Sequence, residues 1–470
     1  MSKAYVTTAI PYMNAAPHVG HALDYLLADV YARYRSEQGD EVKFQAGSDE
    51  HGNKIFKKAL ENGLEAQAYV DLNVEKFQDF IAKLGVKYTD FIRTTSPEHE
   101  KLVQQIWLRL KNHIYAGEYE GWYCEGCEGF ATQKEYEEND GVCPDHKKPY
   151  QKLLEKNYYY KISDFKAQIR AAIESGEMKI LPKFRENEVL QLLSDSPDVS
   201  ISRPNEHLTW GVQVPDDPSQ TIYVWIDALA NYLTVLGYPE KEIEDFWPAD
   251  VQIVGKDILR FHAIIWPAIL LGLGLPLPKV ILSHGFVQSD GQKMSKSIGN
   301  IVNPMEVLEK HGVDAFRYYF LRHIDTFMDA DFTWEKFENA YSGELANDLG
   351  NLVQRLATLC QKNKVKVDDF KADLDAEYLK LMDNFEFSKA MDYIWSKLQD
   401  LNRKIDNTKP WAVAKEDSEA AKKLLTELVQ DLLTANYLLK PFLPICEKIE
   451  KIFTSPEIKA PEQPLFPKNN

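Results

Sequence analysis

Two histidines near the start of the chain have the spacing and the local context of a phosphate-binding site. His18 and His21 lie in the string APHVGHAL, between an apolar, β-branched stretch at 4–10 and apolar residues at helical spacing from Leu23 onward. A turn from a strand into a helix favours anions, because its backbone N–H groups and the helix dipole are positive there. The two imidazoles could donate hydrogen bonds to a phosphate, and Gly20 would leave room for a ligand. Two unrelated surface histidines would give the same string.

A second stretch with suitable chemistry lies far downstream. The loop at 291–300, GQKMSKSIGN, is polar, flanked by glycines, and carries Lys293 and Lys296. Such a loop can move and can place ammonium groups on a triphosphate. On its own the string is equally typical of a plain solvated loop.

Together, HVGH and KMSKS in this order and at this separation resemble the paired signature of class I aminoacyl-tRNA synthetases. The resemblance implies ATP as a substrate, with Mg²⁺ bridging its phosphates. It assigns catalysis to His18, His21, Lys293 and Lys296. It assigns ATP binding to His18, Gly20, His21 and Lys296.

The elements that must position these residues begin as an α/β domain. A strand at 42–46 follows the first helix and ends in the string GSDEHG, so the strand–helix–strand order predicts a parallel sheet with ligands at the carboxyl ends of its strands. Asp49 lies at such an end, where its carboxylate could hold the ammonium group of an amino acid or could cap a helix. The family motif DxHG favours the ligand role. A helical region is expected from there to about Ala116, with a helix start at Ser96-Pro97.

Three of the five cysteines cluster with a histidine in the pattern C-x2-C-x15-C-x2-H, formed by Cys124, Cys127, Cys143 and His146. Three thiolates and an imidazole complete the tetrahedral shell of a structural Zn²⁺ with no open position. A chance cluster or a redox CxxC pair are the alternatives. We expect this zinc lobe to be an insert spanning 117–220, which resembles the one-knuckle connective peptide of methionyl-tRNA synthetases.

After the insert, two strand-to-helix segments carry aromatic residues that could line an apolar pocket or fill a core. They read WIDALANY at 225–232 and GKDILRFH at 255–262, and they match the segments where methionyl-tRNA synthetases build their amino-acid pocket. A thioether is polarizable and packs well beside aromatic rings. Leu229 stands where some family members have proline. The resemblance implies methionine binding by Ile10, Tyr12, Asp49, Trp225, Ala228, Leu229, Tyr232, Ile258 and His262.

From about Tyr341 the strand signals vanish and leucines recur at helical spacing, which predicts an α-helical bundle. Asn351 and Arg355 share a helical face, and Trp411 follows Pro410 at a helix start. An indole can stack on an unpaired base, and Asn with Arg can read base edges, although a core tryptophan and a solvated face would look alike. The resemblance implies that these three residues bind the anticodon. The region is nearly neutral, with 19 Lys and Arg against 21 Asp and Glu, which permits a polyanion to dock.

The predicted architecture is α/β: a Rossmann-type parallel sheet split by the zinc insert and followed by the helical bundle. At 470 residues, several domains are expected. The net charge of −17 argues against loose, nonspecific nucleic-acid binding. No apolar run reaches a membrane span and no signal peptide is recognisable, so no membrane contact is expected. Five cysteines, an odd number with three clustered, favour a reducing cytoplasm. Many members of the resembled family continue into a dimer-forming domain that is not seen in this sequence, so a monomer is expected. The expected domains are catalytic first half 1–116, connective insert 117–220, second half with the lysine loop 221–340, and anticodon-binding bundle 341–470.

The function implied by the resemblance is ATP-dependent attachment of L-methionine to tRNA(Met) through a methionyl-adenylate. One rival is another adenylyl-transferring enzyme with an HxGH motif, but such enzymes usually lack the helical tail. A second rival is a noncatalytic tRNA-binding paralogue, against which the intact HVGH and KMSKS weigh. ATP–pyrophosphate exchange with methionine, then with each other amino acid, separates these readings.

Overall fold

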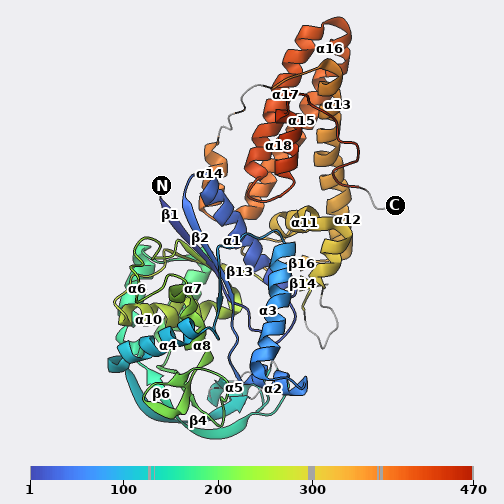
Figure 1. Ribbon diagram of the computed structural model, residues 1–470. Helices are drawn as coiled ribbons and strands as arrows, with labels where there is room; N and C mark the ends of the chain where they lie inside the picture. The colour runs from blue at the N-terminus through green and yellow to red at the C-terminus, as the bar shows by residue number, and fades with distance from the viewer. Residues whose placement is uncertain are drawn as a thin grey trace. The chain divides into compact units, whose positions relative to one another are not determined.

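The computed structural model describes residues 2–124, 129–131, 133–144, 146–289, 291–294, 302–367, 370 and 374–467 (Figure 1). The chain divides into two compact units, each assembled from separate stretches of sequence. The first unit comprises Met1–Ala16, Glu41–Asp79 and Tyr88–Ser283. The second unit comprises Pro17–Asp40, Phe80–Lys87 and His284–Asn470, so it includes the helix that follows the HVGH motif.

A six-stranded sheet forms the centre of the first unit, in the order β3-β2-β1-β12-β13-β7. Its neighbouring pairs β3–β2, β2–β1, β1–β12 and β13–β7 are parallel, as predicted. From β1 the chain first adds strands on one side, β2 and β3, and later adds β12 on the other side. Parallel α/β sheets bind ligands at such a switch point, in a crevice beyond the carboxyl ends of the strands. The strands are β1 (Lys3–Thr8), β2 (Glu41–Ser48), β3 (Asp90–Arg93), β7 (Lys179–Leu181), β12 (Val251–Gly255) and β13 (Val280–His284).

The sheet is buried on both faces, and its register alternates apolar with polar rows. Val6 lies beside Phe44 and Val251, all buried, as expected for a parallel sheet covered on both sides. The helices of this unit are α2 (Asn53–Glu61), α3 (Ala66–Lys83), α4 (Pro97–Arg109), α5 (Gln133–Glu138), α6 (Lys166–Ser175), α7 (Lys183–Asp195), α8 (Val224–Leu229), α9 (Asn231–Thr234) and α10 (Trp266–Gly272).

Two edge strands differ from the sequence prediction. The region to Ala116 was expected to be helical, but β3 lies within it and pairs with the end of β2. Four half-buried residues give too short a pattern to distinguish from a helix by periodicity. The expected helix start is confirmed, because the Ser96 side chain accepts a hydrogen bond from the N–H of His99 at 3.4 Å. The second strand is β7, which comes from within the 117–220 range yet pairs with β13.

The other strands of the 117–220 range form small antiparallel sheets, and the range also holds α5, α6 and α7. A four-stranded sheet has the order β5-β4-β6-β8, and a three-stranded sheet has the order β10-β11-β9. Most of the expected insert therefore has its own sheets, but it also supplies one edge of the main sheet. The strands are β4 (Ile114–Cys124), β5 (Gly129–Ala131), β6 (Gln151–Tyr160), β8 (Val199–Ser200), β9 (Ser202–Pro204), β10 (Gln213–Val214) and β11 (Asp217–Ile222).

The second unit contains the predicted helical bundle, in which α17 packs against α13, α15, α16 and α18 (Figure 1). Its leucines at helical spacing, such as Leu352, Leu398 and Leu428, are fully buried. The helices are α1 (Val19–Glu37), α11 (Pro304–Arg322), α12 (Trp334–Ala340), α13 (Asn351–Asn363), α14 (Ala376–Asp383), α15 (Phe387–Thr408), α16 (Pro410–Glu416), α17 (Ser418–Leu439) and α18 (Cys446–Thr454), with a π-helical segment at Tyr341–Gly350.

A buried ion pair joins the HVGH helix to this bundle. Arg317 of α11 pairs with Asp29 of α1 at 2.7 Å, and both side chains are almost fully buried. The same guanidinium donates hydrogen bonds to the carbonyl oxygens of Leu84, Pro441 and Phe442. A buried charge requires this degree of pairing. The pair therefore explains why α1 groups with the helical unit.

Among the helices of the described residues, none combines the length and the apolar character that a membrane crossing requires.

Candidate functional site

The two histidines of HVGH form the N-terminus of α1 and hydrogen-bond its backbone reciprocally. His18 Nδ1 accepts from the N–H of Gly20 at 3.1 Å, and His21 Nδ1 accepts from the N–H of His18 at 3.2 Å. The rings stack with centroids 3.8 Å apart. Because each Nδ1 is an acceptor, a neutral ring carries its proton on Nε2. Both imidazoles therefore present an N–H donor at a helix N-terminus, which is what binding an anion requires.

Burial favours the neutral form of His21 and lowers its pKa well below the usual value, with a further contribution from the neighbouring His18. Gly20 is needed for a reason that the sequence analysis does not anticipate. A Cβ at this position would lie 2.9 Å from the His18 ring, so the space beside Gly20 is filled by that imidazole. The ATP contact expected of Gly20 stays a prediction.

Within the second unit, the strand end that leads to the lysine loop contacts the same helix. His284 Nε2 lies 2.7 Å from the Asp24 carboxylate of α1, three residues after His21. Gly285 allows the backbone of Met328 to approach, since a Cβ there would lie 2.2 Å from the Met328 carbonyl carbon. The loop then begins in a small sheet of β14 (Val287–Ser289), β15 (Gln292–Lys293) and β16 (Ala330–Phe332).

The structure describes the backbone of one of the two predicted lysines of this loop. Lys293 ends β15, which pairs with β14 at Gln288, and nothing further is described of its side chain. Lys296 lies outside the described residues. Two hydrogen bonds fix the base of the loop: Asp331 accepts from the N–H of Gly291 at 2.8 Å, and Asp329 accepts from the N–H of Phe286 at 2.9 Å.

In the first unit, Asp49 lies directly after β2, at the strand end where the sequence analysis expects it. It forms an isolated parallel bridge with Tyr12, and its N–H donates to the carbonyl of Pro11 at 2.9 Å. Gly52 has a φ of 118°, and a Cβ there would lie 2.2 Å from the Tyr12 hydroxyl oxygen. This glycine therefore allows Tyr12 to reach the Asp49 loop. Ile10 lies beside the same loop, next to Gly47.

The aromatic segments predicted to form a pocket do come together. His262 donates from Nδ1 to the carbonyl of Ile258 at 3.0 Å, so its neutral ring accepts at Nε2 from the Tyr232 hydroxyl at 2.8 Å. Trp225 stacks on Phe261 with centroids 3.7 Å apart and planes within 8°. His262 lies in a π-helical turn, Phe261–Ile265, a feature often found at functional sites. Ala228 and Leu229 are buried on α8 beside them.

Several residues of this region carry no distinguishing signal in the sequence. Phe261 is one of many aromatic residues, although it lies inside the GKDILRFH segment. His51 and Asp227 lie within the quoted strings SDEHG and WIDALANY, and their ion pair joins those strings at 2.7 Å. The residue types allow an ion pair between a histidine and an aspartate, but nothing in the sequence indicates that His51 and Asp227 lie close together.

Three of the four predicted zinc ligands lie close together. Their ligand atoms all fall within 4.8 Å of one another, with His146 Nδ1 at 3.8 Å from Cys124 Sγ and 3.7 Å from Cys143 Sγ. These separations suit donors on one tetrahedral ion with Zn–S near 2.3 Å and Zn–N near 2.0 Å. A tight turn follows Cys143, since Lys147 has a φ of 52° and donates its N–H to the Cys143 carbonyl. Cys127 lies outside the described residues.

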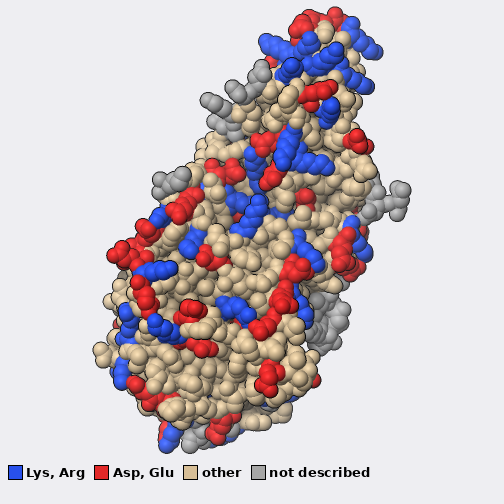
Figure 2. Space-filling model, in the orientation of Figure 1, with Lys and Arg blue, Asp and Glu red and all other residues tan. Residues whose placement is uncertain are grey.

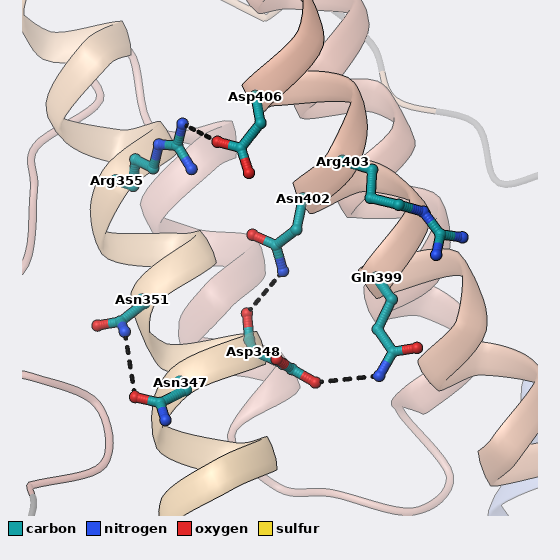
Figure 3. A pocket seen from close by; sticks show the side chains of 8 residues that line it. All are labelled: Asn347, Asp348, Asn351, Arg355, Gln399, Asn402, Arg403 and Asp406. Carbon is teal, nitrogen blue, oxygen red and sulfur yellow. Dashed lines mark hydrogen bonds and ion pairs between the residues drawn. The ribbon is translucent and has the colours of Figure 1, made fainter.

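Two of the three predicted anticodon-binding residues, Asn351 and Arg355, line a hollow of about 410 Å³ in the helical bundle (Figure 3). Asn351 donates to Asn347 at 3.4 Å, and Arg355 donates to Asp406 at 2.6 Å. The guanidinium of Arg355 also lies 5.0 Å from the ring centroid of Trp411, which is 40 % exposed. The hollow is lined by Asn347, Asp348, Asn351, Arg355, Gln399, Asn402, Arg403 and Asp406.

The surroundings of this hollow suit a nucleic acid. Lys and Arg side chains, with Asp and Glu side chains among them, lie over the end of the bundle that carries α16 (Figure 2). The lining is polar and offers both amide and carboxylate groups, while Trp411 presents an exposed aromatic face. Such a combination can stack on an unpaired base and read its edges.

Comparison with known proteins identifies the family. The family model described as tRNA synthetases class I (M) matches residues 4–153 and 145–357. The methionine–tRNA ligase of Caldanaerobacter subterraneus subsp. tengcongensis is 40 % identical over 462 residues, covering 94 % of this chain and 72 % of that protein. The chain belongs to the methionyl-tRNA synthetases of class I. The predicted fold class and family are thereby confirmed.

Further comparisons also match this chain to methionyl-tRNA synthetases. The Listeria innocua methionine–tRNA ligase is 39 % identical over 93 % of this chain and 71 % of its own. The structure of Mycobacterium tuberculosis methionyl-tRNA synthetase in complex with methionyl-adenylate matches with a TM-score of 0.91 and 35 % identity, covering 99 % of this chain and all of that one. Its apo form matches with a TM-score of 0.85 and 31 % identity, covering 100 % of this chain and 99 % of that one.

Proposed function

We propose that this chain attaches L-methionine to tRNA(Met) in two steps through a methionyl-adenylate, using ATP. The observation that carries the proposal is the match, over 99 % of the chain, to a methionyl-tRNA synthetase in complex with methionyl-adenylate. The arrangement of the amino-acid site supports it. A thioether would pack favourably against the rings of Trp225, Phe261 and the Tyr232–His262 pair.

In the first step the methionine carboxylate oxygen attacks the α-phosphorus of ATP, and pyrophosphate leaves. Asp49 holds the ammonium group, while the aromatic pocket holds the side chain. His18 and His21 donate Nε2–H hydrogen bonds to phosphate oxygens as negative charge builds on them. Lys296 faces the reacting phosphorus and the departing pyrophosphate, and Lys293 assists by holding the loop. Mg²⁺, when bound, neutralises phosphate charge.

In the second step a ribose hydroxyl of the terminal tRNA adenosine attacks the carbonyl carbon of the adenylate, and AMP leaves. Asn351, Arg355 and Trp411 bind anticodon bases at the polar hollow. Cys124, Cys127, Cys143 and His146 hold a structural Zn²⁺, supported by the separations of the three described ligands. We place the boundaries between the catalytic halves, the connective insert and the anticodon-binding bundle near residues 116, 220 and 340.

The experiment that tests this function is ATP–pyrophosphate exchange with each of the twenty amino acids in turn. Methionine should support exchange, and valine, isoleucine and leucine should not do so at equal concentration. Charging of tRNA(Met) transcripts, with an anticodon-substituted transcript as the control, tests the second step. Exchange that is equal with several amino acids, or absent with methionine, would contradict the proposal.

A further inference from the structure

A buried carboxylate in the first unit is shared by two imidazoles. The oxygens of Asp227 contact His51 Nδ1 at 2.7 Å and His99 Nε2 at 2.9 Å. All three side chains are at most 3 % exposed. An ionised carboxylate only accepts hydrogen bonds, so both ring nitrogens donate to it. The aspartate is therefore satisfied on both oxygens without water.

The three residues come from separate segments of the unit. His51 follows β2 and is two residues beyond Asp49. His99 lies in the first turn of α4 and also contacts Thr234 of α9 at 2.8 Å. Asp227 lies on α8, between Trp225 and Ala228. The carboxylate thus joins the loop that carries the proposed ammonium ligand to the helix that carries the proposed side-chain pocket.

Electrostatics strengthens the contact between His51 and Asp227. Burial alone would lower the pKa of His51, but the charge and the hydrogen bond of Asp227, together with Glu100 and Asp49, raise it to about 10. Burial alone would raise the pKa of Asp227, yet His51 and His99 lower it to about 2. His51 is therefore an imidazolium at neutral pH, and its Nε2 faces the Glu100 carboxylate at 3.5 Å.

Neighbouring groups restrict the same loop further. Glu50, between Asp49 and His51, accepts from Arg93 Nε and Nη2, each at 2.8 Å, and from the Thr95 hydroxyl at 2.6 Å. Its carbonyl accepts from the Trp210 indole at 2.7 Å. The loop after β2 is therefore held from several sides, but only the Asp227 contact connects it to α8 among these bonds.

We propose that Asp227 is a positioning residue of the amino-acid site, which sets the distance between Asp49 and the α8 pocket through its hydrogen bond to His51. The proposal rests on the proposed function. Asp227 touches no substrate in this scheme. It acts because the ammonium group and the side chain of one small amino acid must be held at the same time, and a misplacement of about 1 Å can cost on the order of 10²-fold in rate.

Asp227→Asn tests the carboxylate itself. The amide keeps the size but carries no charge, and its NH₂ group can pair only with a ring nitrogen that has no proton, so the His51 imidazolium loses its charged acceptor and the pairing with the two rings must change. We expect kcat/KM for methionine in ATP–pyrophosphate exchange to fall by about 10²-fold, with KM for ATP changed by less than about 3-fold. Equal changes in both KM values would contradict a role in positioning the amino acid.

A matched pair at position 51 separates positioning from folding. In His51→Asn the side-chain amide nitrogen lies near the place of Nδ1 and can still donate to Asp227, whereas in His51→Gln it lies near the place of Nε2. Both variants lose the charge, so both should be less stable in thermal unfolding. Positioning predicts KM for methionine close to that of the unmodified chain in His51→Asn and about 10-fold higher in His51→Gln.

The control is His113→Gln, which by the same reasoning removes a similar imidazole–carboxylate contact, 2.8 Å from His113 Nδ1 to Asp164, in a partly exposed place. It should leave both KM values unchanged. If Asp227→Asn fails to fold, the two position-51 variants still decide. Equal methionine KM values in those two would overturn the positioning role while leaving the proposed function intact. An unmodified chain that shows no methionine-dependent exchange would instead overturn the proposed function.

Discussion

The molecule holds two pairs of histidines with different surroundings, and the pKa values of one member of each pair, His21 and His51, shift in opposite directions. At the start of α1, His18 and His21 bond to backbone N–H groups through Nδ1, and burial lowers the pKa of His21. In the first unit, His51 and His99 bond to one buried carboxylate, and the pKa of His51 rises to about 10. The residue type is the same, so the partner decides the charge.

This difference matches the role that we propose for each pair. A neutral imidazole that faces a helix N-terminus can donate a hydrogen bond to a phosphate without first breaking an ion pair. Separating a buried charged imidazole from its carboxylate costs free energy, because an unpaired buried charge would remain. Such a pair therefore holds the segments that carry it at a fixed distance. The comparison predicts that variants of the first pair change the rate of chemistry, and that variants of the second pair change affinity for the amino acid.

The largest effect is expected at His21. His21→Gln keeps a donor near the place of Nε2 and loses the Nδ1 acceptor, while His21→Asn keeps an acceptor near Nδ1 and loses the donor. If donation to phosphate matters, His21→Asn should lower kcat for exchange by about 10²- to 10³-fold and His21→Gln by only about 10-fold. The measurement is steady-state ATP–pyrophosphate exchange. The reverse order would mean that capping α1, not contacting phosphate, is the role of this residue.

A site without histidine provides the next test. Trp411 is exposed and lies beside Arg355, so removing its ring leaves no cavity in the core. Trp411→Ala should raise KM for tRNA(Met) by about 10- to 100-fold, in line with the stacking of one base, and leave the exchange reaction unchanged. Charging assays at varied tRNA measure it. Phe184→Ala, which removes another exposed aromatic ring, should change neither and serves as the control.

A weaker effect is expected at His262, the third histidine of the proposed amino-acid site. Tyr232→Phe removes the hydroxyl that donates to His262 Nε2 and leaves that nitrogen buried without this donor. We expect KM for methionine to rise about 10-fold, because a buried unpaired acceptor costs roughly 1–3 kcal/mol. Tyr160→Phe removes a similar buried hydroxyl, which donates to the Ala268 carbonyl at 2.8 Å. It should lower the melting temperature to a similar extent without changing KM.

How far the sequence predicts these sites depends on the distance along the chain between their parts. The helix start at HVGH, the strand before Asp49 and the clustering of Cys124 and Cys143 with His146 depend on local patterns, so spacing and residue type were enough to predict them, while zinc binding itself stays a prediction. The edge strands β3 and β7 were not predicted, because three or four residues carry too little periodicity and their partners lie far away in sequence. The His51–Asp227 contact spans 176 residues, so no local pattern could indicate it.

The family resemblance supplied what local patterns could not. Trp225 and Tyr232 look like ordinary core residues from the sequence, and Tyr232 is indeed fully buried. What marks them as a site is the hydrogen bond from Tyr232 to His262 and the stacking of Trp225 on Phe261, both of which join separate segments. Gly20 shows the opposite case, since its motif position was recognised but the group that occupies its space was not.

The smallest effect, and the most direct test of the comparison, is the pH dependence of stability. A folded-state pKa below the unfolded value of about 6.5 means that His21 contributes stability above pH 6.5, which is lost as the pH falls. A folded-state pKa raised to about 10 means that His51 contributes fully below pH 6.5, and that this is lost as the pH rises toward 10.

Urea unfolding at several pH values from 5 to 9 measures both trends against the variants His21→Gln and His51→Asn. The difference in unfolding free energy between the unmodified chain and His21→Gln should grow from pH 5 to 6.5. The corresponding difference for His51→Asn should shrink from pH 6.5 to 9, with slopes of at most about 1.4 kcal/mol per pH unit for one proton. Slopes of the same sign would mean that the two environments do not shift the pKa values of His21 and His51 in opposite directions, and the division between a phosphate-binding pair and a positioning pair would have to be abandoned.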